Sequence, residues 1–498
     1  MHARSLALLA FAAAVVAADP SPAAEPGRPN IVFAFADDWG KHAGAYGTPV
    51  VKTPTFDRIA AEGVIFENAF AAAPSCTPSR NAILTGQWPW RLHQGVNLWS
   101  GFPDVPVFTD LLAGAGYHVG HYRKAWGPGK LEFGERKTNP AGPRFNNPKA
   151  FFAARDEGQP FFFWFGASDP HRPFEEGSGE ASGMDLDAIE VPGYLPDARA
   201  IRSDMADYFF EVERFDREVG ELLATIEAMG ELDNTLVVMS GDHGMPFPRA
   251  KSNLYDSGSA VGLAVQWPGR VPAGRVPAGR RLTDFVSLAD LAPTFLEAAG
   301  VEAPAVMTAR GLMAVLESEG AGQVDPERNH VIAAKERHVP SQPAPSAGGY
   351  PSRMIRTADH LYIRNLDPDR WPNGVLDPAE TFLGRALADT DDGPSKKFVV
   401  DNRDDPDGAR FFAYSFARRP LEELYVLADD PDQLRNVADD PEMANTKAKL
   451  WERLESELRA TGDPRILGTE EAALFDRYPY VNAPEGNPIW DEFVMPPR

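Results

Sequence analysis

The stretch CTPSRNAILTG, residues 76–86, begins with Cys76, the only cysteine of the chain. A lone thiol cannot form an intrachain disulfide, so Cys76 is either a small buried hydrophobe or a reactive group. Pro74 and Pro78 disfavour a helix interior at the cysteine, whereas residues 79–85 can begin a helix whose amino end favours an anion. This placement suits a nucleophile.

Upstream, residues 30–36 form a continuous apolar run with the length and residue types of a fully buried strand. The run ends at Asp37 and Asp38. Two adjacent carboxylates at the carboxyl end of a buried strand lie where open α/β sheets bind ligands, and their mutual repulsion favours a bound cation. A solvated turn is the alternative interpretation of this pair.

Three more apolar runs end in polar residues of the types found in active sites. Because several strand ends carry such residues, we expect them to converge on one site. The runs and their polar residues are 117–122 with Lys124, 161–166 with His171, and 235–240 with Asp242 and His243.

The pattern C-x-P-S-R from Cys76 to Arg80, with Thr85-Gly86 after it, resembles the signature of the type I sulfatases, in which the cysteine is oxidised to formylglycine. The resemblance extends from Asn30 to about Asn436, with four motif clusters in family order. It implies the α/β sandwich of the alkaline phosphatase superfamily, with a central mixed sheet between helices and a smaller antiparallel carboxyl-terminal sheet. A structural free cysteine in a loop is the alternative.

The resemblance also implies a metal site next to the nucleophile. Asp37, Asp38, Asp242 and His243 match its ligands, and the implied ion is Ca²⁺. Many relatives carry asparagine where this chain has His243. Since calcium prefers oxygen ligands, the imidazole keeps Mg²⁺ or a transition ion open. A hydroxyl of the hydrated aldehyde, activated by this metal, would attack sulfur.

Four residues take catalytic roles by the same resemblance. Arg80, Lys124 and Lys251 would balance the charge of the sulfuryl group, and His171 would protonate the leaving atom. Lys251 lies in a segment that looks closest to the heparan N-sulfatase, or sulfamidase, branch.

Two residues are candidate substrate contacts. Trp126 stands where the family carries a histidine, so either another histidine replaces that contact or the indole packs against a sugar ring. His338 follows a short apolar strand and is expected to reach the substrate, with a surface position as the alternative.

The chain divides into three expected parts. Residues 1–24 have the basic start, apolar run and small residues of a signal peptide, which predicts a secreted or periplasmic protein. Residues 25–350 form the catalytic domain. Residues 351–498 form a carboxyl-terminal α+β subdomain with an antiparallel sheet. No later segment is apolar enough to be a membrane anchor.

Charge and family together restrict the partners. A net charge of -23 argues against nucleic acid, because a polyanion would be repelled. The expected partners are a sulfated saccharide and a formylglycine-generating or sulfatase-maturating enzyme. Two other functions stay open: a phosphonate or phosphate ester hydrolase of the same superfamily, and an inactive carbohydrate-binding relative. The sugar and the S–N or S–O nature of the bond are also open.

Overall fold

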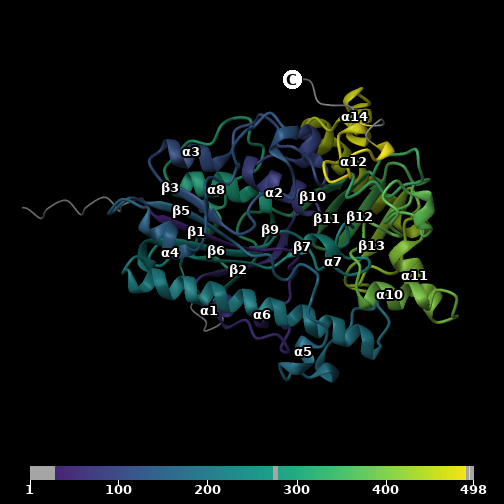
Figure 1. Cartoon of the computed structure of the whole chain (residues 1–498), viewed down its shortest axis with the longest axis horizontal. Helices are drawn as coiled ribbons and strands as arrows, with labels where there is room; N and C mark the ends of the chain where they lie inside the picture. Colours follow the sequence, from purple (N-terminus) through teal and green to yellow (C-terminus); the bar gives the residue numbers. More distant parts are fainter. Residues whose placement is uncertain (1–27, 273–278, 490–492, 494–498) are drawn as a thin grey trace, which may run out of the picture.

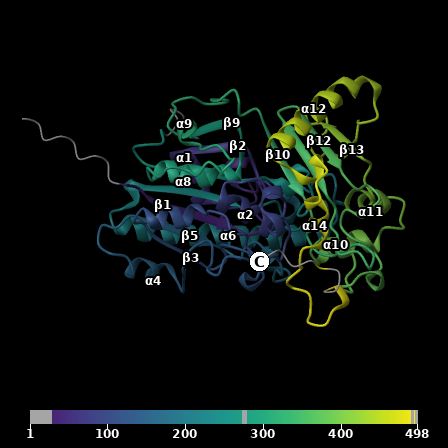
Figure 2. The same cartoon turned by 90° about the horizontal axis from the view of Figure 1, so that it is seen from above.

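The computed structural model describes residues 28–272, 279–489 and 493 of the 498-residue chain. Within them, a large sheet is covered by helices on both faces and a smaller sheet lies at its side (Figure 1; Figure 2). The predicted signal peptide, residues 1–24, lies outside the described residues. Among the described residues, no helix combines the length and apolar character that crossing a membrane requires.

The large sheet has nine strands in the order β4-β3-β5-β1-β6-β8-β2-β7, with β9 beside β2. Strand β1 is parallel to β5 and β6, whereas β8 is antiparallel to β6. The predicted mixed central sheet is therefore confirmed. Its strands are β1 (Asn30–Ala36), β2 (Val64–Phe70), β3 (His118–Tyr122), β4 (Arg144–Phe145), β5 (Phe161–Gly166), β6 (Thr235–Gly241), β7 (Ala260–Val261), β8 (Leu263–Gln266) and β9 (Arg280–Ser287).

Strand β1 is apolar throughout because both of its faces are buried. Ile31 and Phe33 pack with the helices α2, α3 and α8, while Val32 and Ala34 pack with α1 and α6. Side chains alternate between the two faces of a strand, so a strand covered on both faces needs a continuous apolar run. Figure 1 shows α6 running beneath the sheet and α2, α3 and α8 above it.

The second sheet is antiparallel, in the order β10-β11-β12-β13. One face packs on Phe70, Tyr255 and Phe285 of the large unit, and the other is covered by α12. Strand β10 precedes residue 351, where we place the start of the second unit, so this sheet takes strands from both predicted units. Its strands are β10 (His330–Lys335), β11 (Ser352–Thr357), β12 (His360–Asn365) and β13 (Glu422–Val426).

The helices have the following bounds: α1 (Pro54–Glu62), α2 (Cys76–Thr85), α3 (Phe108–Gly114), α4 (Pro148–Ala153), α5 (Ser178–Ala181), α6 (Arg199–Ala228), α7 (Asp256–Ser259), α8 (Leu291–Ala298), α9 (Met313–Leu316), α10 (Pro394–Asp401), α11 (Gly408–Phe416), α12 (Ala444–Ala460), α13 (Pro464–Leu467) and α14 (Glu471–Arg477).

Candidate active site

The site lies at one edge of the large sheet, where neighbouring strands end. Strands β3, β5, β1 and β6 are adjacent and mutually parallel, so their carboxyl ends meet at the same edge. A cavity of about 640 Å³ opens there. The predicted site residues among those lining it are Asp37, Cys76, Lys124, His171, Lys251 and His338.

Cys76 is the first residue of α2 and is 2% exposed. Its Sγ lies 3.3 Å from His243 Nε2 and 3.9 Å from Asp38 Oδ1. Burial raises the pKa of the Cys76 thiol well above its ordinary value, more than the nearby Lys124 ammonium lowers it. The thiol therefore lies within the predicted ligand set and not in a separate apolar pocket.

Arg80 connects two of the converging strand ends. Its guanidinium is fully buried and donates from Nε to Asp242 Oδ2 (2.9 Å) and from Nη2 to Asp37 Oδ1 (3.1 Å). Lys124 Nζ donates to the other Asp37 oxygen at 2.5 Å. Burial by itself would raise the pKa of Asp37, but Lys124 and Arg80 outweigh it and hold that pKa well below its usual range.

Lys251 pairs with the second carboxylate of the Asp37–Asp38 pair. Its ammonium is buried and donates to Asp38 Oδ2 at 2.7 Å and to Asp391 Oδ2 at 2.8 Å. Burial lowers the pKa of Lys251, but the two carboxylates outweigh it, so the pKa rises well above its ordinary value. Lys251 therefore stays charged beside the site.

The donors around Cys76 fit a divalent cation. The side chains of Asp38, Asp242 and His243 are 0% exposed, and Asp38 has a φ of 67°, a left-handed conformation that aspartate tolerates better than most residues. His243 Nδ1 lies 3.0 Å from the carbonyl oxygen of Gly244, which leaves Nε2 directed at the cluster. In three groups of described residues, the potential ligand atoms all lie within 4.8 Å of one another. The groups are Asp38, Cys76 and His243; Asp37, Cys76 and Asp242; and Asp37, Asp38 and His171. Carboxylate oxygens with one imidazole suit a hard or borderline cation.

Two histidines occupy different depths of the site. His171 is about one-third exposed, and its Nδ1 lies 2.5 Å from the carbonyl oxygen of Arg172, which leaves Nε2 available 3.9 Å from Asp38 Oδ2. His338 is buried, and its Nδ1 lies 2.8 Å from Ser75 Oγ. Burial lowers the pKa of His338 to about 3, so its ring is neutral at ordinary pH.

Trp126 is placed beside the site and is not among the described residues that line the cavity. Its indole N–H donates to Asn81 Oδ1 at 2.9 Å, and its ring meets Phe102 edge-on. Its role as a substrate contact stays a prediction. The hydrogen bond ties the Lys124 loop to helix α2, which carries Cys76.

Five polar or aromatic residues that line the cavity lie away from the strand ends and motifs that the sequence marked, and the sequence did not identify them. They come from irregular segments, where no strand end or family motif marks them, and only the folded chain brings them to the nucleophile. They are Trp99, Arg385, Asp391, Tyr480 and Asn482.

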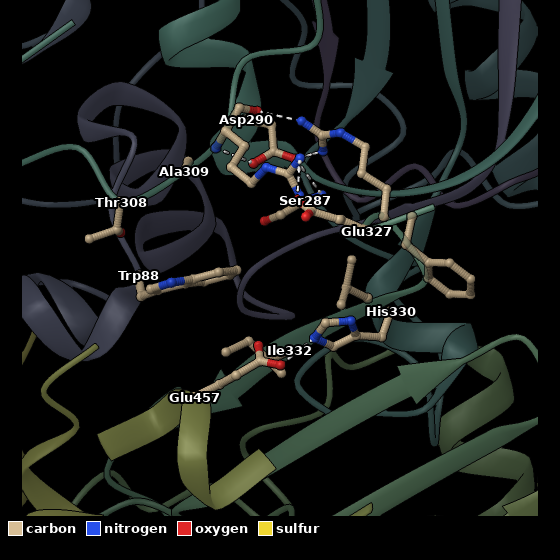
Figure 3. Close-up of a pocket in the computed structure, with 13 residues that line it drawn as sticks. Trp88, Ser287, Asp290, Thr308, Ala309, Glu327, His330, Ile332 and Glu457 are labelled. Atoms are coloured by element: carbon tan, nitrogen blue, oxygen red, sulfur yellow. Dashed lines mark hydrogen bonds and ion pairs between the residues drawn. The ribbon is translucent and has the colours of Figure 1, made fainter. Parts of the chain in front are cut away.

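A second cavity, of about 130 Å³, lies beside the four-stranded sheet (Figure 3). None of the predicted site residues lines it. Arg328 Nη1 pairs with Asp290 at 2.8 Å, and His330 Nε2 pairs with Glu457 at 2.5 Å. Because the predicted site residues line the larger cavity near Cys76 and not this one, the cavity near Cys76 is the stronger candidate for the active site.

Known proteins resemble the chain in sequence. A family model described as Sulfatase matches residues 29–301. The chain is 29% identical to N-sulphoglucosamine sulphohydrolase of Homo sapiens, over 89% of this chain and 92% of that protein. It is 26% identical to an ulvan-active sulfatase of Formosa agariphila, over 90% of this chain and 77% of the relative.

Solved structures resemble it in fold. One holds D-glucosamine-2-N,6-O-disulfate, described as its substrate, and matches with a TM-score of 0.61 and 20% identity, over 88% of this chain and 99% of that one. Another is a phosphonate monoester hydrolase from Silicibacter pomeroyi, with a TM-score of 0.60 and 18% identity, over 88% of this chain and 96% of that one.

Proposed function

Since the chain belongs to the sulfatase family, we propose that it removes sulfate from a sulfated carbohydrate with a formylglycine made from Cys76. The observation that carries this proposal is the position of Cys76, which begins α2 with its sulfur 3.3 Å from His243 Nε2 in a cluster of buried carboxylates and cations. A structural cysteine would not need this polar surrounding.

Two groups complete the site in this proposal. The hydrated aldehyde of formylglycine supplies the hydroxyl that attacks sulfur and a second hydroxyl for sulfate release. A divalent cation, Ca²⁺ or Mg²⁺, supplies Lewis-acid stabilisation when bound. Asp37, Asp38, Asp242 and His243 would hold it, and the Nδ1 contact of His243 with Gly244 keeps the ring in the orientation for that role.

The remaining polar residues bind and orient the sulfate. Lys124 and Lys251 both line the cavity and are charged, so they would neutralise sulfate oxygens from two sides. Arg80 is fully enclosed and pairs with Asp37 and Asp242, so its role is to hold these carboxylates in place. His171 Nε2 faces the cavity and would give a proton to the leaving atom.

The substrate class we favour is a saccharide with an N-sulfated glucosamine. The support is the similarity to N-sulphoglucosamine sulphohydrolase along almost the whole of both chains. Export to a secreted or periplasmic location, and oxidation of Cys76 by a formylglycine-generating or sulfatase-maturating enzyme, belong to the same proposal.

A substrate panel tests this function. The purified protein is incubated with N-sulfoglucosamine, with O-sulfated glucosamines and with phosphate and phosphonate monoesters, and free sulfate, phosphate and amine are measured. We expect sulfate and free amine from N-sulfoglucosamine. Efficient hydrolysis of the phosphorus esters without sulfate release would overturn the proposal, and release from O-sulfated sugars alone would correct the substrate.

A further inference from the structure

One wall of the active-site cavity is a loop from the segment between β12 and β13, residues 385–392. The loop wraps around the buried ammonium of Lys396, which donates to the carbonyl oxygens of Ala386 (3.0 Å), Leu387 (3.1 Å) and Thr390 (2.9 Å). Three carbonyls on one ammonium fix the course of the backbone.

Asp389 attaches this loop to the body of the site. Its Oδ1 accepts from the backbone N–H of Val339 and from Ser341 Oγ, both at 3.0 Å. Val339 itself lines the cavity next to His338. The loop is therefore fixed at two places, by Lys396 at its centre and by Asp389 at its contact with the site. Asp391 lies two residues after Asp389, so its position is fixed as well.

Asp391 brings a carboxylate to the cavity. Oδ2 accepts from Lys251 Nζ at 2.8 Å, whereas Oδ1 has no hydrogen-bond partner among the described residues. The side chain is 24% exposed and lines the cavity, so a group of the substrate can reach this carboxylate. A sulfate oxygen bound by Lys251 would lie within about 6 Å of this carboxylate, the length of two hydrogen bonds.

The charge of this wall next to Lys251 is negative. Lys251 is shared by Asp38 and Asp391, so one ammonium faces two carboxylates. Arg385, the cation of the same loop, pairs with Asp392 at 3.4 Å. A hydroxyl or amino group on the sugar carbon next to the sulfated one could donate to Asp391. A second sulfate at that carbon would meet a like charge at short range, in a partly buried site where screening is weak.

From this geometry we propose that Asp391 is a specificity-determining residue that accepts a hydrogen bond from the substituent vicinal to the scissile sulfate and excludes vicinally disulfated sugars. The inference rests on the proposed function, because it takes Lys251 as a sulfate contact. A sulfate farther around the ring does not face this carboxylate and is tolerated.

The test compares three substrates by kcat/KM, with free amine as the readout: N-sulfoglucosamine, glucosamine-2-N,3-O-disulfate as the vicinal case and glucosamine-2-N,6-O-disulfate as the distal case. Wild type should prefer the monosulfate over the vicinal disulfate by at least about tenfold. Asp391→Asn keeps the shape of the side chain and removes its charge, so it should reduce this preference at least about fivefold. The ratio of kcat/KM for the monosulfate to that for the 2-N,6-O-disulfate should stay unchanged.

Asp404→Asn is the matched control. Asp404 lies in the same segment between β12 and β13, its side chain is 84% exposed, and it does not line the cavity, so its substitution should leave both ratios as in wild type. The ratio of kcat/KM for the monosulfate to that for the vicinal disulfate could be equal in wild type and Asp391→Asn, with both proteins folded by circular dichroism. This result would overturn the inference about Asp391 and leave the proposed function standing. If wild type acts only on an O-sulfated sugar, the same comparison applies to that sugar and its vicinal disulfate. Release from none of the sugars would overturn the proposed function as well.

Discussion

Arg80 and His171 show two kinds of site residue. Arg80 is fully buried, and removing it would leave Asp242 without its arginine partner and Asp37 with Lys124 alone; breaking such a buried pair destabilises a protein by roughly 3–5 kcal/mol. Loss of activity in an Arg80 variant would therefore not separate chemistry from folding. His171 is about one-third exposed and forms no buried ion pair at hydrogen-bond distance, so its substitution isolates a chemical role.

Substituting His171→Ala should slow the release of sulfate from a sugar roughly 10²–10⁴-fold, because a poor leaving group needs a proton. Sulfate release from 4-nitrophenyl sulfate should fall much less, since nitrophenolate leaves without protonation. The two rates are measured on the same preparation. Lys124→Ala, which removes a contact to the sulfate itself, should slow both substrates by a similar factor, and an equal loss on both in His171→Ala would contradict the acid role.

Single residues at strand ends were predictable, and those in irregular loops were not. Asp37, Lys124, His171 and Asp242 follow apolar runs, so the sequence pattern and a family motif both mark them. Asp391 lies in a loop whose course depends on Lys396 and Asp389, contacts that form only in the folded chain. No periodicity or residue spacing in the sequence indicates how this loop is folded.

Strand β5 and the loop after β3 pack closely where the site begins. A Cβ built at Gly166 would lie 1.7 Å from the carbonyl oxygen of Lys124, a backbone atom that cannot move without moving the loop. The end of β5 thus constrains the backbone of the loop that carries Lys124. The sequence predicted the β5 strand but did not indicate why its last residue is glycine.

Gly166→Ala should displace the Lys124 loop, lower sulfatase activity by at least about tenfold and destabilise the fold by roughly 1–3 kcal/mol. Gly114→Ala serves as its control, because a Cβ at Gly114 meets nothing within 4 Å, and it should leave activity unchanged. Activity and chemical denaturation are measured for both. Wild-type activity in Gly166→Ala would show that this contact does not position Lys124.

The sequence predicted helix α6 but not its exact bounds. Apolar residues recur at helical spacing from Ser203 onward and Gly230 closes the pattern, so the sequence predicts a helix over residues 203–230. The structure has one over Arg199–Ala228. The helix begins four residues earlier than predicted. The sequence did not show this start, because the N-cap residue Ala198 has no side chain that can cap a helix. The buried face was nevertheless predicted, with Met205, Val212 and Val219 all in the core.

At the scale of the whole molecule, two sheets share one site. The four-stranded sheet packs on the large unit through Phe70 and Phe285, and the segment between its strands β12 and β13 supplies Asp391. The family resemblance predicted this second sheet and its antiparallel pairing. It did not predict that the carboxyl-terminal part contributes a partner for Lys251.

Buried histidines should make the whole fold sensitive to acid. Burial lowers the pKa of His121 to about 4, while the unfolded chain titrates near the ordinary value of 6.5. Because the unfolded state binds the proton first, stability is complete above pH 6.5 and is lost as the pH falls towards 4. His121 should account for roughly 2–4 kcal/mol of this loss.

The measurement is the free energy of unfolding in urea between pH 7 and pH 4. His121→Asn keeps a donor for the carbonyl oxygen of Gly142, which His121 Nδ1 contacts at 3.1 Å, but cannot titrate. Its stability should therefore depend less steeply on pH than that of wild type. The same slope in both proteins would mean that His121 is not buried in its neutral form.

The most direct measurement is the mass of the tryptic peptide that spans residues 59–80 and contains Cys76, taken together with sulfate release by the same preparation. We predict that protein from a host with the maturating enzyme carries an aldehyde at position 76. Its rate of sulfate release from N-sulfoglucosamine should rise in proportion to the aldehyde fraction, and Cys76→Ala should release none. Sulfate release by protein whose peptide 59–80 retains an unmodified thiol would contradict a formylglycine nucleophile.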